Sequence, residues 1–419
     1  MHPAQQSRRS FLKTSTLSGV SLMYLPVLSK FPGYSSKPLD YSIDHLIPTR
    51  LFDGSKCWVH PRAGIVPGAG NQGKPRVVMT MNTLDLDGSD VFKGMFGFET
   101  DDVGENWTEI EQLAPLAPRF EVIEGVNRPV AASDFWPMFH KKSNQLLGIG
   151  HTVVYTPEWK VTMPRPRHTS YSVYNPTNRE WSTWKKLELP PLHKFHNSGA
   201  GCAQRYDLPD GKILLPVSLY PKDKNSHITV LECAFDGTDL TYLGQGNELG
   251  INNQTRGLHE ASMTRFDGRY YMTIRNDERG FLSTSEDGLH FTPIQPWTFD
   301  DGSELGSYNT QQHWVTHSDA LYLVYTRRGA NNDHVFRHRA PLFIGQVDPV
   351  KLCVIRETER VLVPERGARL GNFGVTDISP DETWVTVSEW MQPRGVEKYG
   401  SDGSVWVARL HWNRPNKLF

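Results

Sequence analysis

The chain has 419 residues, of which 38% are hydrophobic and 22% are charged, with 35 glycines, 29 prolines and 12 tryptophans. This composition is typical of a globular protein and excludes a disordered or fibrous chain. Lysines and arginines number 45 against 46 acidic residues, which leaves a formal net charge of -1. No overall positive field therefore recruits nucleic acid or an anionic membrane, and any anion site must be local.

The N-terminus carries an export motif. The string Ser-Arg-Arg-Ser-Phe-Leu-Lys at residues 7–13 precedes an apolar stretch that ends near Leu28, a pattern typical of a twin-arginine signal. We predict that residues 1–35 are this signal and that residues 36–419 form the exported domain, periplasmic or extracellular in a bacterium. The partner during secretion would be the twin-arginine export machinery. No later segment approaches the ~18 apolar residues of a membrane span, so none is expected.

The rest of the chain repeats one unit six times: a short strand, a tight turn and a strongly β-forming strand. The predicted hairpins pair residues 62–66 with 76–81, 135–140 with 146–155, 202–206 with 212–218, 261–266 with 270–275, 312–316 with 321–326, and 373–378 with 383–389.

A second hairpin with a polar turn follows each of the first five units. Four strands per unit make the blade of a β-propeller, so we predict an all-β, six-bladed propeller. The sixth unit ends with the strand at 404–412 and lacks a fourth strand, while the segment 41–52 has no partner of its own. Pairing these two segments closes the propeller and removes an exposed edge.

Two turns carry a recognisable sequence. Residues 100–107 read Thr-Asp-Asp-Val-Gly-Glu-Asn-Trp, and residues 285–291 read Ser-Glu-Asp-Gly-Leu-His-Phe. In such a turn the Asp accepts backbone N–H groups, the Gly takes positive φ and the aromatic packs between blades. Both turns resemble the Asp-boxes of the sialidase superfamily, which lie between the third and fourth strands of a blade. The resemblance covers the whole chain after the signal and implies a sialidase-like fold.

The resemblance implies an arginine cluster that holds a substrate carboxylate. Arg62 stands where the first arginine of the superfamily lies, although its motif is altered. Arg275 closes the second strand of the fourth blade and resembles the second arginine. Arg337 or Arg339, just before the third strand of the fifth blade, resembles the third.

The resemblance also implies catalytic carboxylates. Asp90 falls where the superfamily places its acid/base, Glu260 resembles the family glutamate that precedes the second arginine, and Glu389 matches the glutamate that polarises the nucleophile. The nucleophile itself is missing, because Asn372 occupies the stretch where the family has tyrosine. An amide cannot form the covalent glycosyl intermediate, so the retaining route requires Tyr308 or Tyr220, and otherwise water attacks directly.

Other polar residues open the blades beside the channel. His60 lies two residues before Arg62, so on a regular strand the two would share a face and place a base beside an anion clamp. Gln312 and His313 open the fifth blade and are predicted to bind substrate, with Asn372. The alternative is that such histidines only satisfy buried backbone groups.

The cysteines Cys57, Cys202, Cys233 and Cys353 contain no Cys-x-x-Cys pair. We expect buried thiols, or one or two disulfides. A zinc site of channel histidines with Cys202 lacks any supporting spacing. We expect no metal and no cofactor.

Three functions remain open. The first is a secreted sialidase-like exo-glycosidase, a hydrolase that removes a terminal acidic sugar from an oligosaccharide or polysaccharide. The second is a propeller lyase or rhamnosyl-glucuronate-cleaving enzyme that uses His60 as the base for β-elimination. The third is a non-catalytic glycan-binding propeller. Arg275→Met is expected to abolish activity with a melting temperature changed by only a few degrees.

Overall fold

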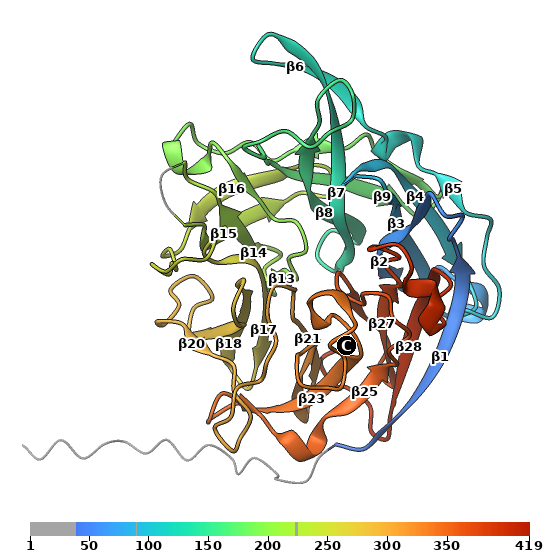
Figure 1. Ribbon diagram of the computed structural model, residues 1–419, viewed down its shortest axis with the longest axis vertical. Helices are drawn as coiled ribbons and strands as arrows, with labels where there is room; N and C mark the ends of the chain where they lie inside the picture. The colour runs from blue at the N-terminus through green and yellow to red at the C-terminus, as the bar shows by residue number, and fades with distance from the viewer. Residues whose placement is uncertain (1–38, 89, 223–224) are drawn as a thin grey trace, which may run out of the picture. The chain divides into compact units, whose positions relative to one another are not determined.

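Six antiparallel sheets follow one another along the chain and surround a central channel in the computed structural model (Figure 1). The structure describes residues 39–88, 90–222 and 225–419. The predicted signal at 1–35 lies outside them. Within the described part every regular element is a strand or a short 3-10 turn, and it contains no helix that is long and apolar enough to cross a membrane. The predicted six-bladed β-propeller is confirmed.

The first three blades are formed by β2 to β16. Blade 1 consists of β2 (Lys56–Val66), β3 (Arg76–Asp85), β4 (Phe92–Thr100) and β5 (Glu111–Gln112). Blade 2 consists of β6 (Arg119–Ile123), β7 (Val126–His140), β8 (Gln145–Val154), β9 (Thr169–Asn175), β10 (Glu180–Trp181) and β11 (Lys185–Lys186). Blade 3 consists of β12 (Ser198–Gly199), β13 (Tyr206–Asp207), β14 (Ile213–Leu219), β15 (His227–Phe235) and β16 (Leu240–Gln245).

The last three blades complete the circle. Blade 4 consists of β17 (His259–Phe266), β18 (Arg269–Arg275), β19 (Phe281–Ser285) and β20 (Gln295–Pro296). Blade 5 consists of β21 (His313–His317), β22 (Ala320–Tyr325), β23 (Leu342–Asp348), β24 (Cys353–Val354) and β25 (Arg360–Val363). Blade 6 consists of β26 (Gly374–Ser379), β27 (Glu382–Ser388), β28 (Ser404–Trp412) and the N-terminal β1 (Tyr41–Arg50).

Two elements differ from the sequence prediction. The inner strand of blade 3, expected at 202–206, is split into β12 and β13, because the chain turns inward around Cys202, which has φ 64. The hairpin of β6 and the first half of β7 was not predicted, and it extends beyond its blade in Figure 1. In β6 the exposed apolar side chains of Phe120 and Val122 alternate with Arg119 and Glu121. The turn that follows is Glu124-Gly125, which is not a typical turn dipeptide.

The predicted closure between the two ends of the propeller is confirmed. β1 pairs antiparallel with β28, from Tyr41 opposite Trp412 to Arg50 opposite Ser404, and Figure 1 shows the two strands side by side. The Tyr41 ring lies 5.3 Å from Trp412 and 5.6 Å from Tyr322 of blade 5. This one tyrosine therefore joins the outer strand of blade 6 to the neighbouring blade.

The Asp-box turns form where they were predicted, between β4 and β5 and between β19 and β20. In the first, the Asp102 carboxylate accepts the N–H of Asn106 at 2.8 Å, and Gly104 has φ 87. Trp107 then packs 6.1 Å from Trp384 of blade 6. All four cysteines are buried and free, which confirms the thiols rather than disulfides.

Tyr41→Ala should lower the free energy of unfolding by ~3 to 5 kcal/mol, as expected when a buried aromatic side chain is removed. The variant loses the contacts of the Tyr41 ring with Trp412 and Tyr322, which help to close the propeller. Ser42→Ala is the matched control, because Ser42 is exposed on the same strand and its removal should stay within about 0.5 kcal/mol. Urea titration measures both, and equal midpoints for the two variants would contradict this role of Tyr41.

Candidate functional site

A cavity of about 1460 Å³ opens over one end of the channel and is lined by residues from all six blades. Basic side chains along its wall outnumber the carboxylates. The lysines and arginines are Arg128, Arg165, Arg167, Lys186, Lys222, Arg256, Arg275, Arg337, Arg339 and Arg369, and the carboxylates are Asp90, Glu121, Glu124, Asp134 and Glu260. An anionic ligand is therefore the chemistry that this cavity fits best.

The cavity floor is a ring of six side chains, one from each blade, and all of them except Cys202 line the cavity. In blades 1, 2 and 4 the ring residue lies in a β-bulge, at the register shifts between Val59 and Arg62, Ser133 and Trp136, and His259 and Ser262. A bulge re-aims a side chain, and here it turns the side chain toward the channel axis. The ring residues are His60, Asp134, Cys202, Glu260, Gln311 and Asn372, and all but Gln311 have left-handed φ between 50 and 66°.

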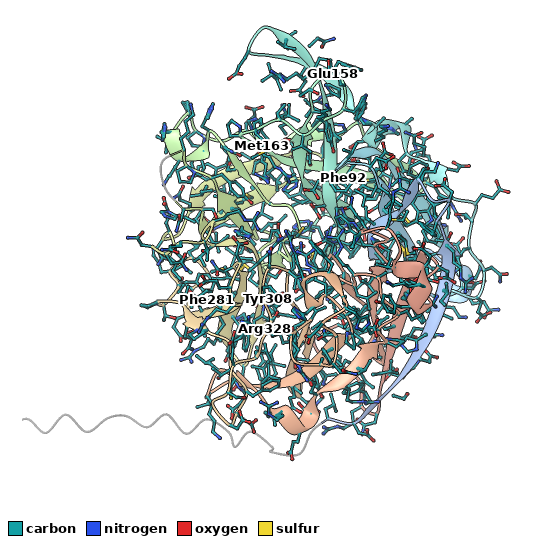
Figure 2. All side chains as sticks on the ribbon, viewed as in Figure 1. Phe92, Glu158, Met163, Phe281, Tyr308 and Arg328 are labelled. Atoms are coloured by element: carbon teal, nitrogen blue, oxygen red, sulfur yellow. The ribbon has the colours of Figure 1, made fainter. Side chains whose placement is uncertain are left out.

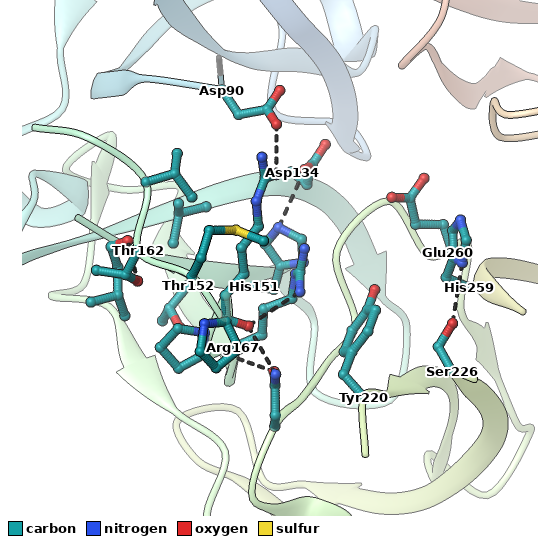
Figure 3. A pocket seen from close by; sticks show the side chains of 18 of the residues that line it. Asp90, Asp134, His151, Thr152, Thr162, Arg167, Tyr220, Ser226, His259 and Glu260 are labelled. Carbon is teal, nitrogen blue, oxygen red and sulfur yellow. Dashed lines mark hydrogen bonds and ion pairs between the residues drawn. The ribbon is translucent and has the colours of Figure 1, made fainter. Parts of the chain in front are cut away.

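Asp134 is the buried anion of this ring. Its carboxylate lies 3.4 Å from Nδ1 of His60 and 3.4 Å from Nε2 of His151, and it accepts a hydrogen bond from the Cys202 thiol at 2.8 Å. Figure 3 shows Asp134 above His151. The third blade leaves room for His151 only because residue 201 is glycine: a Cβ on Gly201 would lie 2.2 Å from Nδ1.

Gln311 joins the other half of the ring. Its amide nitrogen donates to the Cys202 sulfur at 3.0 Å and to the Glu260 carboxylate at 2.8 Å, and its carbonyl accepts the N–H of Asn372 at 3.0 Å. The Asn372 amide then contacts Nε2 of His60 at 2.6 Å. Side chains from all six blades are thus joined in one hydrogen-bonded network.

Burial and neighbouring charges fix the protonation of the ring. Burial lowers the pKa of His60 to about 4. Burial alone would raise the pKa of Asp134, but the two imidazoles and the Arg62 guanidinium around it hold that pKa well below its usual range. Burial likewise opposes the charge of Glu260, yet Arg275 lowers its pKa to about 2. The floor therefore holds two carboxylates and a neutral His60 at neutral pH.

Arg62 and His313 lie beneath this floor and do not line the cavity. Arg62 is fully buried, with its guanidinium 3.4 Å from Asp134 and 5.5 Å from the Trp136 ring. Nδ1 of His313 is hydrogen-bonded to the Ser262 hydroxyl at 2.8 Å, and the centre of its ring lies 4.8 Å from that of Trp136. The bulge between Val59 and Arg62 breaks the alternation of the strand, so His60 lines the cavity and Arg62 does not. Both side chains still lie 3.4 Å from the same Asp134 oxygen.

Gln312 and Glu389 are also outside the cavity lining. The Gln312 amide is buried and bonds Ser307 at 2.9 Å and Thr273 at 3.1 Å. The Glu389 carboxylate accepts the N–H of Asp402 at 2.8 Å and pairs with Arg366 at 3.2 Å. These contacts give both residues structural partners away from the site.

Blades 4, 5 and 6 supply an arginine wall, which we define as Arg256, Arg275, Arg337, Arg339 and Arg369. Asn309, a residue that the sequence analysis did not single out, accepts hydrogen bonds from three of these arginines. The Asn309 side-chain oxygen accepts from Arg275 at 2.8 Å and from Arg256 at 3.3 Å, and its backbone carbonyl accepts from Arg339.

The arginine wall contains more positive charge than the protein neutralises. Arg275 pairs with Glu260, and Arg256 pairs with Asp277 at 2.5 Å. Within the described residues, Arg337, Arg339 and Arg369 have no carboxylate partner at ion-pair distance.

Burial and mutual repulsion act on these three arginines. Burial, then Arg275, Arg369 and Arg337, lower the pKa of Arg339 well below its usual range. Burial, then Arg337, lowers the pKa of Arg369 to about 10. Guanidiniums that lower one another's pKa in a cavity indicate a candidate anion-binding site, because a bound anion would relieve their repulsion.

Blades 1, 2 and 3 face the arginine wall with a different set of groups. Asp90 pairs with Arg165 at 2.6 Å, and the side chains of both are 32% exposed. Arg167 lies 4.3 Å over the ring of Tyr220. Figure 3 shows Asp90 and Tyr220 on opposite sides of His151, with the Tyr220 hydroxyl directed into the cavity.

The two tyrosines considered as substitute nucleophiles lie in different places. Tyr220 lines the cavity, and burial raises the pKa of its phenol. Tyr308 instead bonds His338 at 2.7 Å, and the Arg328 guanidinium lies 5.0 Å from the centre of its ring. Figure 2 labels Tyr308 and Arg328 next to each other. Tyr308 is not among the lining residues, so only Tyr220 has access to a ligand in this cavity.

The zinc alternative finds no support in the part of the chain that the structure describes. No group of three or more His, Cys, Asp or Glu side chains there is arranged to hold a metal ion. Cys202 is engaged by Asp134 and Gln311 instead.

The position of Glu260 changes the expectation for Arg275→Met. Arg275 is the ion partner of Glu260, and their side chains are only 9% and 17% exposed. Removing Arg275 leaves a nearly buried carboxylate without its cation, so the melting temperature should fall together with activity.

Glu260→Gln should destabilise the protein at neutral pH by ~3 to 5 kcal/mol, because Arg275 is left buried without its carboxylate. The pKa of Glu260 is about 2 in the folded protein against 4.5 for an ordinary glutamate. Its contribution is therefore complete above pH 4.5 and is lost as the pH falls toward 2. Melting curves between pH 7 and 3 should show a smaller acid-induced loss in the variant. Glu286→Gln, at an exposed pair with Arg269, is the control, and parallel pH curves for Glu260→Gln and wild type would contradict the assignment.

Comparison with known proteins gives the fold. No protein-family model and no curated protein matches the sequence. Among solved structures, a protein of unknown function from Dyadobacter fermentans superposes with a TM-score of 0.57 at 12% identity, covering 88% of this chain and 99% of that one. Trypanosoma rangeli sialidase superposes with a TM-score of 0.57 at 11% identity, covering 88% of this chain but 60% of the sialidase. The NanB sialidase of Streptococcus pneumoniae, as its K499G mutant, gives 0.57 at 13% identity, with 89% and 70% covered. The chain therefore has the six-bladed β-propeller fold of the sialidases.

Proposed function

We propose that this protein is a glycoside hydrolase that binds the terminal acidic sugar of a glycan and cleaves its glycosidic bond. The observation that carries the proposal is the arginine wall, where Arg337, Arg339 and Arg369 face a large cavity without carboxylate partners among the described residues. A sugar carboxylate in this position would make charge-assisted and partly bidentate bonds. The similarity of the fold to solved sialidase structures supports an acidic sugar as the substrate.

The groups opposite the arginine wall fit proton transfer without a covalent intermediate. The Asp90 carboxylate lies in the cavity wall, 2.6 Å from Arg165, where it can take the proton of an attacking water. Burial raises the pKa of the Tyr220 phenol, while the Arg167 guanidinium 4.3 Å over its ring lowers it. Tyr220 can therefore give its proton to the leaving oxygen, because Arg167 stabilises the phenolate that remains. Water then adds to the anomeric carbon as the glycosidic bond breaks, and the fixed charge of Glu260 stabilises the oxocarbenium-like transition state.

Direct attack by water is favoured over a covalent route by Asn372. Asn372 stands where the resemblance expects tyrosine. Its side-chain amide contacts Nε2 of His60, and its backbone N–H donates to the Gln311 side chain. The anomeric configuration of the product would therefore be inverted. Export by the twin-arginine route remains part of the proposal, because a secreted enzyme meets such glycans outside the cytoplasm.

Arg337→Met should weaken binding of sialic acid or glucuronic acid by roughly 10- to 100-fold, the loss expected for one charge-assisted hydrogen bond. Its melting temperature should stay the same or rise, because the change relieves repulsion with Arg275 and Arg256. Calorimetry measures both quantities. Arg269→Met, which removes an exposed arginine outside the cavity, is the matched control. Equal affinities for the two variants would remove the basis of the proposal.

Asp90→Asn should lower kcat by at least ~100-fold on every substrate, as expected when a general acid or base is removed. Tyr220→Phe should lower kcat strongly on natural glycans but little on nitrophenyl glycosides, whose leaving group needs no proton. Mass detection of products from sialosides, glucuronides and rhamnosyl-glucuronate glycans provides the assay.

Two outcomes would replace hydrolysis by another function. An unsaturated uronate product, with Asp90→Asn active and His60→Ala inactive, would establish β-elimination. Tight binding of acidic glycans with no product from any of them would establish a non-catalytic glycan-binding propeller.

A further inference from the structure

A second cavity of about 420 Å³ adjoins the large one, on the side of blades 2 and 3. Four basic side chains line both cavities, so the two spaces lie on either side of the same residues. They are His168, Lys186, His193 and His196. The rest of the second cavity is mostly apolar and includes Leu189, Pro190, Pro191 and Leu192.

The combined space is too large for one sugar. A pocket for a single small ligand has a volume of about 300 to 1,000 Å³, whereas the large cavity alone has about 1460 Å³. A terminal acidic sugar at the arginine wall would leave the side of blades 2 and 3 empty. The sugars to which it is linked therefore have a path toward the second cavity.

The turn that forms one wall of the second cavity is bonded to the loop of Arg165 and Arg167. Arg165 is the ion-pair partner of Asp90, the proposed acid/base. The side chain of Asn197 accepts the N–H of Arg167 at 2.9 Å and donates to the carbonyl of Arg165 at 2.9 Å. The turn that bears His193 and His196 is thus fixed relative to Asp90.

The turn itself is rigid and leaves its imidazoles available. It is the 3-10 helix η3 (His193–Phe195), which is anchored by the buried ring of Phe195 in the core between blades 2 and 3. His193 and His196 are exposed, and within the described chain neither side chain makes a hydrogen bond to the protein. Imidazole nitrogens beside an apolar surface of proline and leucine suit a sugar ring, which offers hydroxyls at its edge and C–H groups on its face.

We propose that the second cavity is an outer subsite for the same glycan, in which His193 and His196 bind a sugar on the leaving-group side, beyond the sugar that is linked directly to the acidic terminus. The inference rests on the proposed function and specifies its substrate class: an oligosaccharide or polysaccharide with an acidic end, rather than a single sugar on a short aglycone. Each imidazole contributes an ordinary hydrogen bond. The subsite therefore adds affinity for a glycan that is long enough to reach it.

The test compares di-, tri- and tetrasaccharides that share one terminal acidic sugar, in a sialic acid series and a glucuronic acid series. For wild type, kcat/KM should rise at least ~10-fold from the disaccharide to the tetrasaccharide, as expected for two hydrogen bonds. His193→Ala/His196→Ala should lose this rise and keep the disaccharide rate. Lys194→Ala is the matched control, because Lys194 is on the same turn but pairs with Glu248 at 3.1 Å.

Binding calorimetry on the same series gives the same comparison for glycans that are not cleaved. A wild type that is indifferent to chain length, or a double variant that loses the same factor at every length, would overturn the outer subsite. Failure of the proposed function looks different: Arg337→Met would then bind every length as tightly as wild type. If Arg337→Met weakens all lengths equally while the double variant matches wild type, only the outer subsite is wrong.

Discussion

The hydrogen-bonded ring at the channel mouth is the constraint on which the site depends. Each blade contributes one residue, and five of the six adopt left-handed φ. Such conformations cost of the order of 1–3 kcal/mol each for residues other than glycine, and they persist only where surrounding contacts hold them. Here the bonds from Gln311 to Cys202 and Glu260, and from Asn372 to His60, supply those contacts.

The ring also divides the channel into a sealed part and a functional part. Below it, Arg62, Trp136 and His313 pack against one another and fill the axis. Above it, the loops of all six blades surround an open cavity. Buried charge is compensated inside the ring, where Asp134 meets two imidazoles and a guanidinium. On the arginine wall, Arg337, Arg339 and Arg369 have no carboxylate partner within the described residues, and that difference separates a structural network from a ligand site.

The two halves of the propeller divide the chemistry. Blades 4 to 6 carry the arginine wall, while blades 1 to 3 carry Asp90, Tyr220 and the turn with His193 and His196. A substrate held by its carboxylate on one side therefore presents its glycosidic bond and its remaining sugars to the other. A net charge of -1 over the whole chain is compatible with this arrangement because the excess positive charge is confined to the cavity.

The sequence alone determined the number of blades, their turns and the closure by β1, because hairpins and Asp-box turns are local features with a fixed pattern of residues. It also identified Asp90, Glu260, Arg275 and the 337–339 segment as cavity residues. Tertiary structure decided the rest. A bulge shifts the alternation of a strand by one residue, so Arg62 lies under the floor instead of in the clamp. In blade 5, Gln311 and Gln312 precede β21, and Gln311 rather than Gln312 lines the cavity. Asp134 and Asn309 had no sequence signal, because each acts only through partners that come from other blades.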